Sequence, residues 1–74
     1  MKRKVVAVEW VDAIFDPDEQ RTTFSTPPNV VTYGVLLADN DEYVRVAGEA
    51  FEDGTYRATT TIPRGMVRKV RKLR

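Results

Sequence analysis

Two groups of acidic residues are the first candidates for chemistry in this 74-residue chain. The pair Asp16 and Asp18, and the run Asp39, Asp41 and Glu42, could flank a substrate or hold a divalent cation. Neither group has the spacing of a calcium-binding loop, which needs a glycine at its sixth position and a glutamate at its twelfth. Histidine and cysteine are absent, so the usual general base, the usual nucleophile and most transition-metal sites are missing. We therefore interpret the acidic residues as turn formers and expect no enzyme activity, no cofactor and no metal site.

The basic residues form a second candidate site, because they gather at the two ends of the chain. All eleven acidic residues lie between positions 9 and 53, whereas residues 57–74 hold seven basic residues and no acidic one. If the two ends lie side by side, they would form a positive patch that grips phosphates, with binding that weakens strongly as salt rises. This nucleic-acid site would consist of Lys2, Arg3, Lys4, Arg64, Arg68, Lys69, Arg71, Lys72 and Arg74.

Two considerations weigh against a nucleic-acid site in the basic segments. The acidic middle of the chain could neutralise their charges through ion pairs between strands. Aromatic side chains that would stack on bases are also scarce there, and none follows Tyr56. The basic ends by themselves therefore predict no more than nonspecific contact with a phosphate backbone.

A third candidate site lies in residues 12–29, which concentrate aspartate, proline, serine and threonine. Such a composition predicts one long loop, and a loop of this length in so short a chain is expected to be functional or disordered. A surface for a protein or small ligand would then be formed by Phe15, Phe24, Pro27 and Pro28, together with Pro63 and Met66 of a later turn. In the alternative interpretation, Phe15 and Phe24 only cap the open end of the core.

The elements that must position these residues are strands, since β-branched residues, glycines and prolines leave little room for helix. Gly34 inside the second strand predicts a bend, a bulge or a close backbone contact. Asp53-Gly54 predicts a hairpin turn. In the last segment, Val67, Val70 and Leu73 recur every three residues, which also allows a helical turn, although a strand is favoured. The expected strands are 4–11, 30–38, 42–50, 55–62 and 67–73, with a tight turn over 63–66.

This element order resembles the SH3-like barrel family. The segment Ile62-Pro63-Arg64-Gly65-Met66-Val67-Arg68-Lys69-Val70 resembles its Ile-Pro-x-x-x-Val-x-x-Ile/Val closing segment. The resemblance implies an all-β, five-stranded small barrel whose long loop 12–29, second turn 39–42 and 3₁₀ turn 63–66 form one binding surface. The aromatic segments of the signalling SH3 domains are missing, so polyproline recognition is not implied. An Sm-like barrel is the second candidate fold, because the Ile-x-x-Gly-x-Val spacing in IPRGMV resembles that of its second motif. More loosely, Trp10 with Asp12, and Thr60 to Gly65, look like small bacteriophage accessory proteins.

Taken as a whole, the sequence predicts a single domain over residues 1–74, with the long loop at 12–29 and a basic C-terminal strand at 67–74. The apolar run after Lys4 is too short for a signal peptide or a membrane span, so we expect a cytoplasmic protein. A core this small favours a homo-oligomer. The expected function is a non-enzymatic binding or adaptor module that takes a protein or small ligand through its long loop and 3₁₀ turn. The looser resemblance implies a bacteriophage accessory protein that binds a host protein or a small ligand in this way. Nucleic-acid binding by the basic ends is the alternative.

Overall fold

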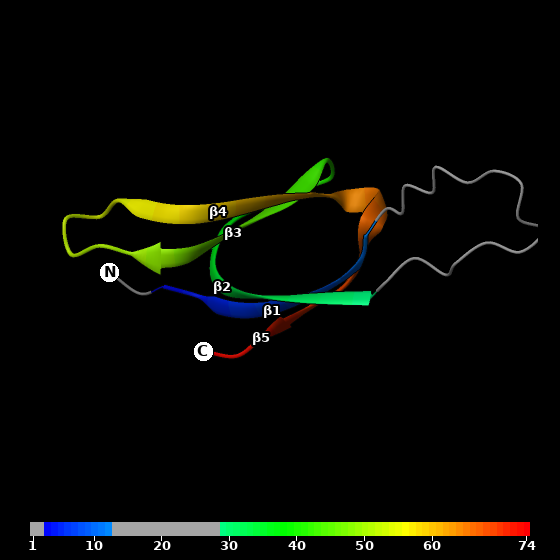
Figure 1. The fold of residues 1–74 in the computed structure, drawn as a ribbon, viewed down its shortest axis with the longest axis horizontal. Coiled ribbons are helices and arrows are strands. Elements are labelled where there is room, and N and C mark those ends of the chain that lie inside the picture. The colour runs from blue at the N-terminus through cyan, green and yellow to red at the C-terminus, as the bar shows by residue number, and fades with distance from the viewer. Residues whose placement is uncertain (1–2, 13–28) are drawn as a thin grey trace, which may run out of the picture.

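The computed structural model describes residues 3–12 and 29–74, and these residues form an all-β structure (Figure 1). The strands and the single 3₁₀ turn are β1 (Val5–Val11), β2 (Asn29–Asp39), β3 (Tyr43–Ala50), β4 (Tyr56–Pro63), η1 (Arg64–Met66) and β5 (Val67–Lys72). Each expected strand is present, and its ends lie within one residue of the expected bounds. The prediction of an all-β fold is therefore confirmed.

The strands form one antiparallel sheet in the order β4-β3-β2-β1-β5. The sheet curves strongly, so that β3 and β4 lie across from β1 and β5 in Figure 1. Among the described residues, β4 and β5 are not paired with each other and form the two edges. Closure into a barrel is therefore not confirmed, and the SH3-like and Sm-like assignments stay predictions.

The core lies on the concave face of the curved sheet. Along β1, alternation places Val6 and Val8 on this face, where both are buried. They pack with Val44, Val46 and Ile62, which come from β3 and β4. Because these strands are not neighbours of β1 in the sheet, the contact requires the sheet to fold over onto itself.

Gly34 lies where β2 changes its partner. The strand pairs with β1 from Asn29 to Val35, and with β3 from Val35 to Asp39. A Cβ atom on Gly34 would be 2.2 Å from the carbonyl oxygen of Ala47 and 2.7 Å from Cγ1 of Val46. The expected close backbone contact is thus confirmed, and only glycine lets the β3 backbone come this near.

A β-bulge in β5 explains the three-residue spacing of its apolar residues. Trp10 pairs with Val67 while the adjacent Glu9 pairs with Lys69, so Arg68 is an extra residue in β5. The bulge lets Val67 and Val70 both pack against the core although they are three residues apart. The prediction of a strand, not a helical turn, is confirmed. Leu73 follows the end of the strand and is 44% exposed, so it is not a core residue.

Two of the expected turns lie next to each other. In the β2–β3 turn, the Asn40 side-chain oxygen accepts hydrogen bonds from the backbone N–H groups of Glu42 and Tyr43. Arg64 of η1 donates its backbone N–H to the carbonyl oxygen of Glu42, and its side chain reaches the Asn40 carbonyl oxygen and the Asp39 carboxylate. The second turn and the 3₁₀ turn are therefore joined through one arginine.

The β3–β4 hairpin ends in the turn that Asp53-Gly54 predicted. The backbone N–H of Gly54 donates to the carbonyl oxygen of Phe51, and Gly54 has the positive φ of 91° that glycine adopts without strain. Hydrogen bonds from the hydroxyl group and then from the backbone N–H of Thr55 lower the pKa of the Asp53 carboxyl group. Below the turn, Glu49 accepts two hydrogen bonds from Arg57, which lower the pKa of its carboxyl group.

The Glu49–Arg57 pair makes the hairpin sensitive to acid. Because the folded-state pKa of Glu49 lies below its ordinary value, the pair contributes stability at pH values above the unfolded pKa. This contribution is lost as the pH falls through the folded pKa. We expect the melting temperature of the Glu49→Gln variant to lie slightly below that of the wild type at neutral pH. The two curves should converge as the pH is lowered in thermal unfolding experiments, and a constant difference would contradict the pairing.

Candidate nucleic-acid interface

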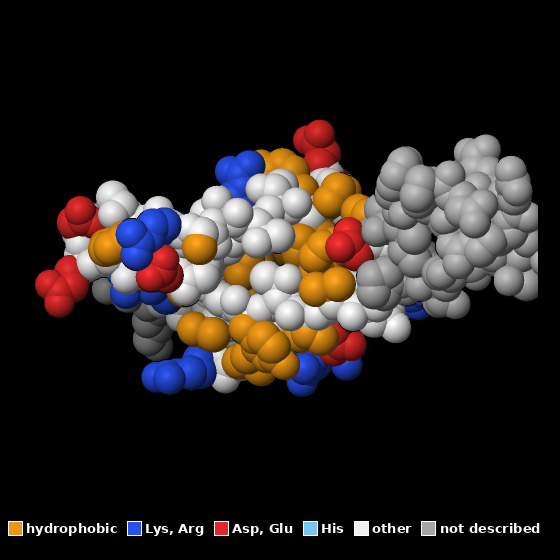
Figure 2. All heavy atoms as spheres, viewed as in Figure 1, with side chains coloured by type: hydrophobic (Ala, Val, Ile, Leu, Met, Phe, Trp, Pro, Cys, Tyr) orange, Lys and Arg blue, Asp and Glu red, His pale blue; other side chains and the backbone are white. Residues whose placement is uncertain are grey.

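Positive and negative charges lie on different parts of the sheet. The segments of β1 and β5, residues 3–12 and 67–74, hold seven basic and two acidic residues. The segments of β2 to η1, residues 29–66, hold six acidic and three basic residues. Because β1 and β5 are adjacent at one side of the sheet, the basic residues share one region. Figure 2 shows acidic side chains at the tip of the β3–β4 hairpin, and Lys and Arg side chains along the margin over β1 and β5.

The ion pairs between described residues are local and do not join the two regions of opposite charge. Arg57 pairs with Glu49 across the β3–β4 hairpin, at 2.7 Å. Arg64 pairs with Asp39 between neighbouring turns. Within the basic region, the Nε atom of Arg71 lies 2.9 Å from Oε2 of Glu9. Of the predicted phosphate-binding residues that the structure describes, two form ion pairs, Arg64 with Asp39 and Arg71 with Glu9.

The remaining cations of the basic region divide into two groups. Arg3 donates to the carbonyl oxygen of Phe51 at 3.2 Å, and its guanidinium lies 6.0 Å from the ring centre of Tyr56. Five side chains make no hydrogen bond or ion pair within residues 3–12 and 29–74, namely Lys4, Arg68, Lys69, Lys72 and Arg74. We name these five residues the basic margin. Lys2 lies outside the described residues.

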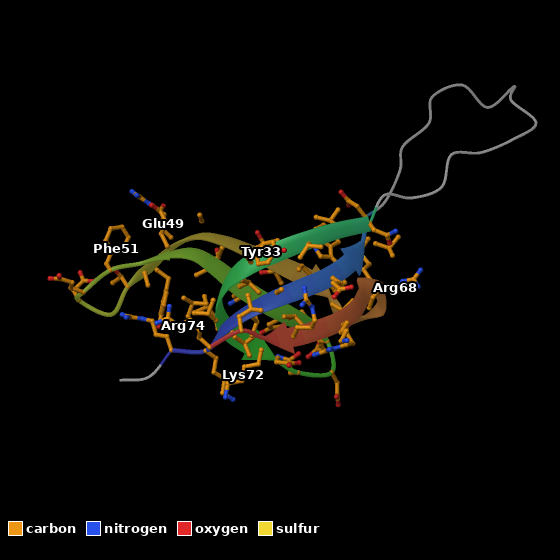
Figure 3. The ribbon with its side chains drawn as sticks, turned by 90° about the horizontal axis from the view of Figure 1, so that it is seen from below. Tyr33, Glu49, Phe51, Arg68, Lys72 and Arg74 are labelled. Carbon is orange, nitrogen blue, oxygen red and sulfur yellow. The ribbon has the colours of Figure 1, made fainter. Side chains whose placement is uncertain are left out.

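Pairing of β1 with β5 brings the two ends of the chain together. The Val5 backbone N–H donates to the carbonyl oxygen of Arg74 at 2.9 Å, and Lys72 is the register partner of Val6. Lys4, Lys72 and Arg74 therefore lie at the same end of the sheet. Arg68 lies at the opposite end of β5, as Figure 3 shows. The basic margin thus extends along the whole length of β5.

Tyr33 lies on the convex, outer face of the sheet, which it shares with part of the basic region. Ala7 is the register partner of both Tyr33 in β2 and Arg71 in β5, so these residues form a row across three strands. The neighbouring row consists of Val31, Glu9 and Lys69. Tyr33 is 61% exposed, and Figure 3 shows it over β2. The convex face therefore carries apolar side chains on β2 and cations on β5.

Tyr33 was missed by the reasoning from the sequence. That reasoning looked for aromatic residues within the basic segments, whereas Tyr33 lies 36 positions before Lys69 along the chain. The alternation of Val31, Tyr33 and Val35 in β2 was the available signal, because it places all three on one face. Which cations share that face depends on strand order and register.

A shallow pocket lies at the end of the sheet where β1 ends and β2 begins. Its lining consists of Glu9, Trp10, Asn29, Val30, Val31 and Arg68. The Nε1 atom of Trp10 donates to Oγ1 of Thr32 at 2.9 Å, which fixes the indole at the side of this pocket. Arg68 reaches the pocket as the extra residue of the β-bulge.

The predicted loop surface is described only in part. Phe15, Phe24, Pro27 and Pro28 lie outside the described residues. Pro63 is exposed at the end of β4. Met66 is half-buried and packs against the core cluster, so its side chain has a structural role in η1.

Nowhere in residues 3–12 and 29–74 do three acidic side chains gather closely enough to hold a metal ion. The described part of the chain has no helix long and apolar enough to cross a membrane.

Comparison with known proteins found no matching family model, no matching curated protein and no matching solved structure. The candidate interface therefore rests on the geometry of this chain. The resemblance to bacteriophage accessory proteins stays a prediction.

Proposed function

We propose that this chain is a non-enzymatic binding module that holds nucleic acid on the basic margin of its sheet. The observation that supports this proposal is that Lys4, Arg68, Lys69, Lys72 and Arg74 have no partner among the described residues while sharing the β1–β5 side of the sheet. The N–H donors of these five side chains are therefore available to an external anion. A polymer of phosphates is the ligand that contacts cations spread along a whole strand.

The separation of charges on the sheet limits where a polyanion can bind. The acidic β3–β4 hairpin and the β2–β3 turn repel phosphates, so a bound polyanion is confined to the β1–β5 side. Each phosphate contact releases condensed counterions, and this release supplies most of the affinity in nonspecific binding. The expected complex is therefore independent of base sequence and sensitive to salt.

Fluorescence anisotropy with labelled DNA and RNA oligonucleotides of mixed sequence tests the proposal. With four to five contacts, the logarithm of the association constant should fall against the logarithm of salt concentration with a slope of about −3 for single strands. The affinity should therefore decrease by roughly two orders of magnitude between about 50 and 200 mM salt. No binding at the lower salt concentration, or binding that salt does not weaken, would refute the proposal.

The pocket at the end of β1 supports a second candidate function, the binding of a protein or small ligand. Trp10 supplies an aromatic wall and Arg68 a cation, which suit a ligand with an apolar part and an anionic group. Trp10 is the single tryptophan of the chain, so its fluorescence would report a ligand in this pocket directly.

A further inference from the structure

We infer that the outer face of β2, β1 and β5 binds single-stranded nucleic acid in preference to duplex, with Tyr33 stacking on a base. This inference rests on the proposed function and specifies which kind of nucleic acid the surface takes. It concerns the row Tyr33, Ala7 and Arg71 and the neighbouring row Val31, Glu9 and Lys69.

The exposure and place of Tyr33 are the first argument. A side chain that is 61% exposed contributes little to folding through burial. Its neighbours on the strand face are aliphatic, Val31 and Val35, and its partner in β1 is the small Ala7. An aromatic ring with this surrounding is accessible to the flat face of a nucleobase. Bases in a single strand offer that face, whereas bases in a duplex are already stacked on each other.

The distance across the strands is the second argument. Neighbouring strands lie about 4.8 Å apart, so the backbone at Tyr33 is roughly 10 Å from the backbone at Arg71. A base that stacks on Tyr33 can therefore extend its phosphates toward Lys69 and Arg71 on β5.

Glu9 of β1 lies between the apolar side chains of β2 and the cations of β5. Its negative charge limits the affinity of this face for nucleic acid. Its Oε2 atom accepts a hydrogen bond from Nε of Arg71 at 2.9 Å. Arginine has five N–H donors, so Arg71 retains donors for a phosphate oxygen while it holds Glu9. Lys69, the register partner of Glu9, is part of the basic margin. The face is thus cationic on β5 and apolar on β2, the combination found in sequence-tolerant single-strand binders.

The test compares oligo(dT) of about 15 nucleotides with a duplex of the same length in fluorescence anisotropy titrations at one low salt concentration. We expect the wild type to bind the single strand several-fold more tightly than the duplex. The variant Tyr33→Ser should lose about tenfold in affinity for the single strand and little for the duplex. Tyr33→Phe should retain the preference, because the stacking ring remains.

Phe51→Ser is the matched control. Phe51 is also an exposed aromatic, at 40%, but it lies at the tip of the β3–β4 hairpin. This control should bind both ligands as the wild type does. Circular dichroism and thermal unfolding of each variant verify that the sheet is intact.

Three results would count against the inference or the proposal beneath it. Equal wild-type affinity for both ligands, unchanged in Tyr33→Ser, would overturn the inference while the basic-margin proposal stands. An equal loss for both ligands in Tyr33→Ser would show that the tyrosine supports the surface structurally and does not stack. Absence of binding to either ligand would overturn the proposed function itself.

Discussion

Replacing Gly34 with alanine should remove most of the stability of this domain. The added Cβ would lie 2.2 Å from a backbone oxygen of β3, a contact that no change of rotamer relieves. Forcing extra atoms into a packed region costs about 1 to 3 kcal/mol, and a clash with backbone belongs at the upper end. A core of this size supplies only about 3 to 5 kcal/mol of net stability. Chemical denaturation should therefore show a large decrease in the midpoint, or a chain that is already unfolded.

Gly65→Ala is the matched control for this prediction. Gly65 lies in η1, and a Cβ built on it has no atom within 4 Å. Its replacement should change the unfolding midpoint very little. If Gly34→Ala unfolds at the same denaturant concentration as Gly65→Ala, then β3 does not approach Gly34 as closely as described.

Reversing two charges of the basic margin should abolish nucleic-acid binding at moderate salt. In the variant Lys69→Glu with Lys72→Glu, two phosphate contacts are lost and two repulsive charges are introduced on the same strand. Each lost contact should reduce the magnitude of the salt slope by about 1. We expect the affinity at low salt to fall by roughly a hundredfold or more in anisotropy titrations.

The matched control reverses two charges on the other side of the molecule. Arg45→Glu with Arg57→Glu changes the net charge by the same amount, but both residues lie in the acidic β3–β4 hairpin. A surface confined to β1 and β5 predicts a much smaller decrease for this control. Similar decreases in both variants would mean that net charge governs binding, and would contradict a localised interface.

The strands were predictable because their local signals agreed. The β-branched residues of β1 indicated a strand, and Asp53-Gly54 indicated the hairpin turn. Gly34 indicated a bend, a bulge or a close backbone contact, and only the three-dimensional arrangement identifies the contact as one with β3. The spacing of Val67 and Val70 was ambiguous because a bulge shifts the alternation in β5 by one residue, and a bulge leaves no clear trace in a single sequence.

The candidate interface was only partly predictable. The sequence lists the cations, and pairing of the chain ends was a reasonable expectation for a small sheet. Which cations lack a partner was not accessible, because Arg71 meets Glu9 and Arg64 meets Asp39 only in the folded register. The row that joins Tyr33 to Arg71 passes through Ala7, and it exists because β1 lies between β2 and β5.

Association between copies of the chain stays a prediction, and the sheet edges bear on it. β5 carries four basic side chains, Arg68, Lys69, Arg71 and Lys72, and their like charges discourage pairing with another β5. In the other edge strand, Ala58 has a φ of 59°, a left-handed conformation that interrupts the extended backbone of β4. A homo-oligomer would therefore form through side-chain faces more readily than through edge-to-edge hydrogen bonds.

The bulge in β5 makes Arg68 a residue that the pairing with β1 does not require. Without this residue, Val67 would still oppose Trp10, Lys69 would still oppose Glu9 and the strand would alternate regularly. Arg68 is in effect a one-residue insertion into a strand that is complete without it. Arg68 has no register partner in β1, and its guanidinium lies at the rim of a pocket. An insertion or deletion at this one position would therefore alter what the molecule binds while leaving how it folds largely unchanged.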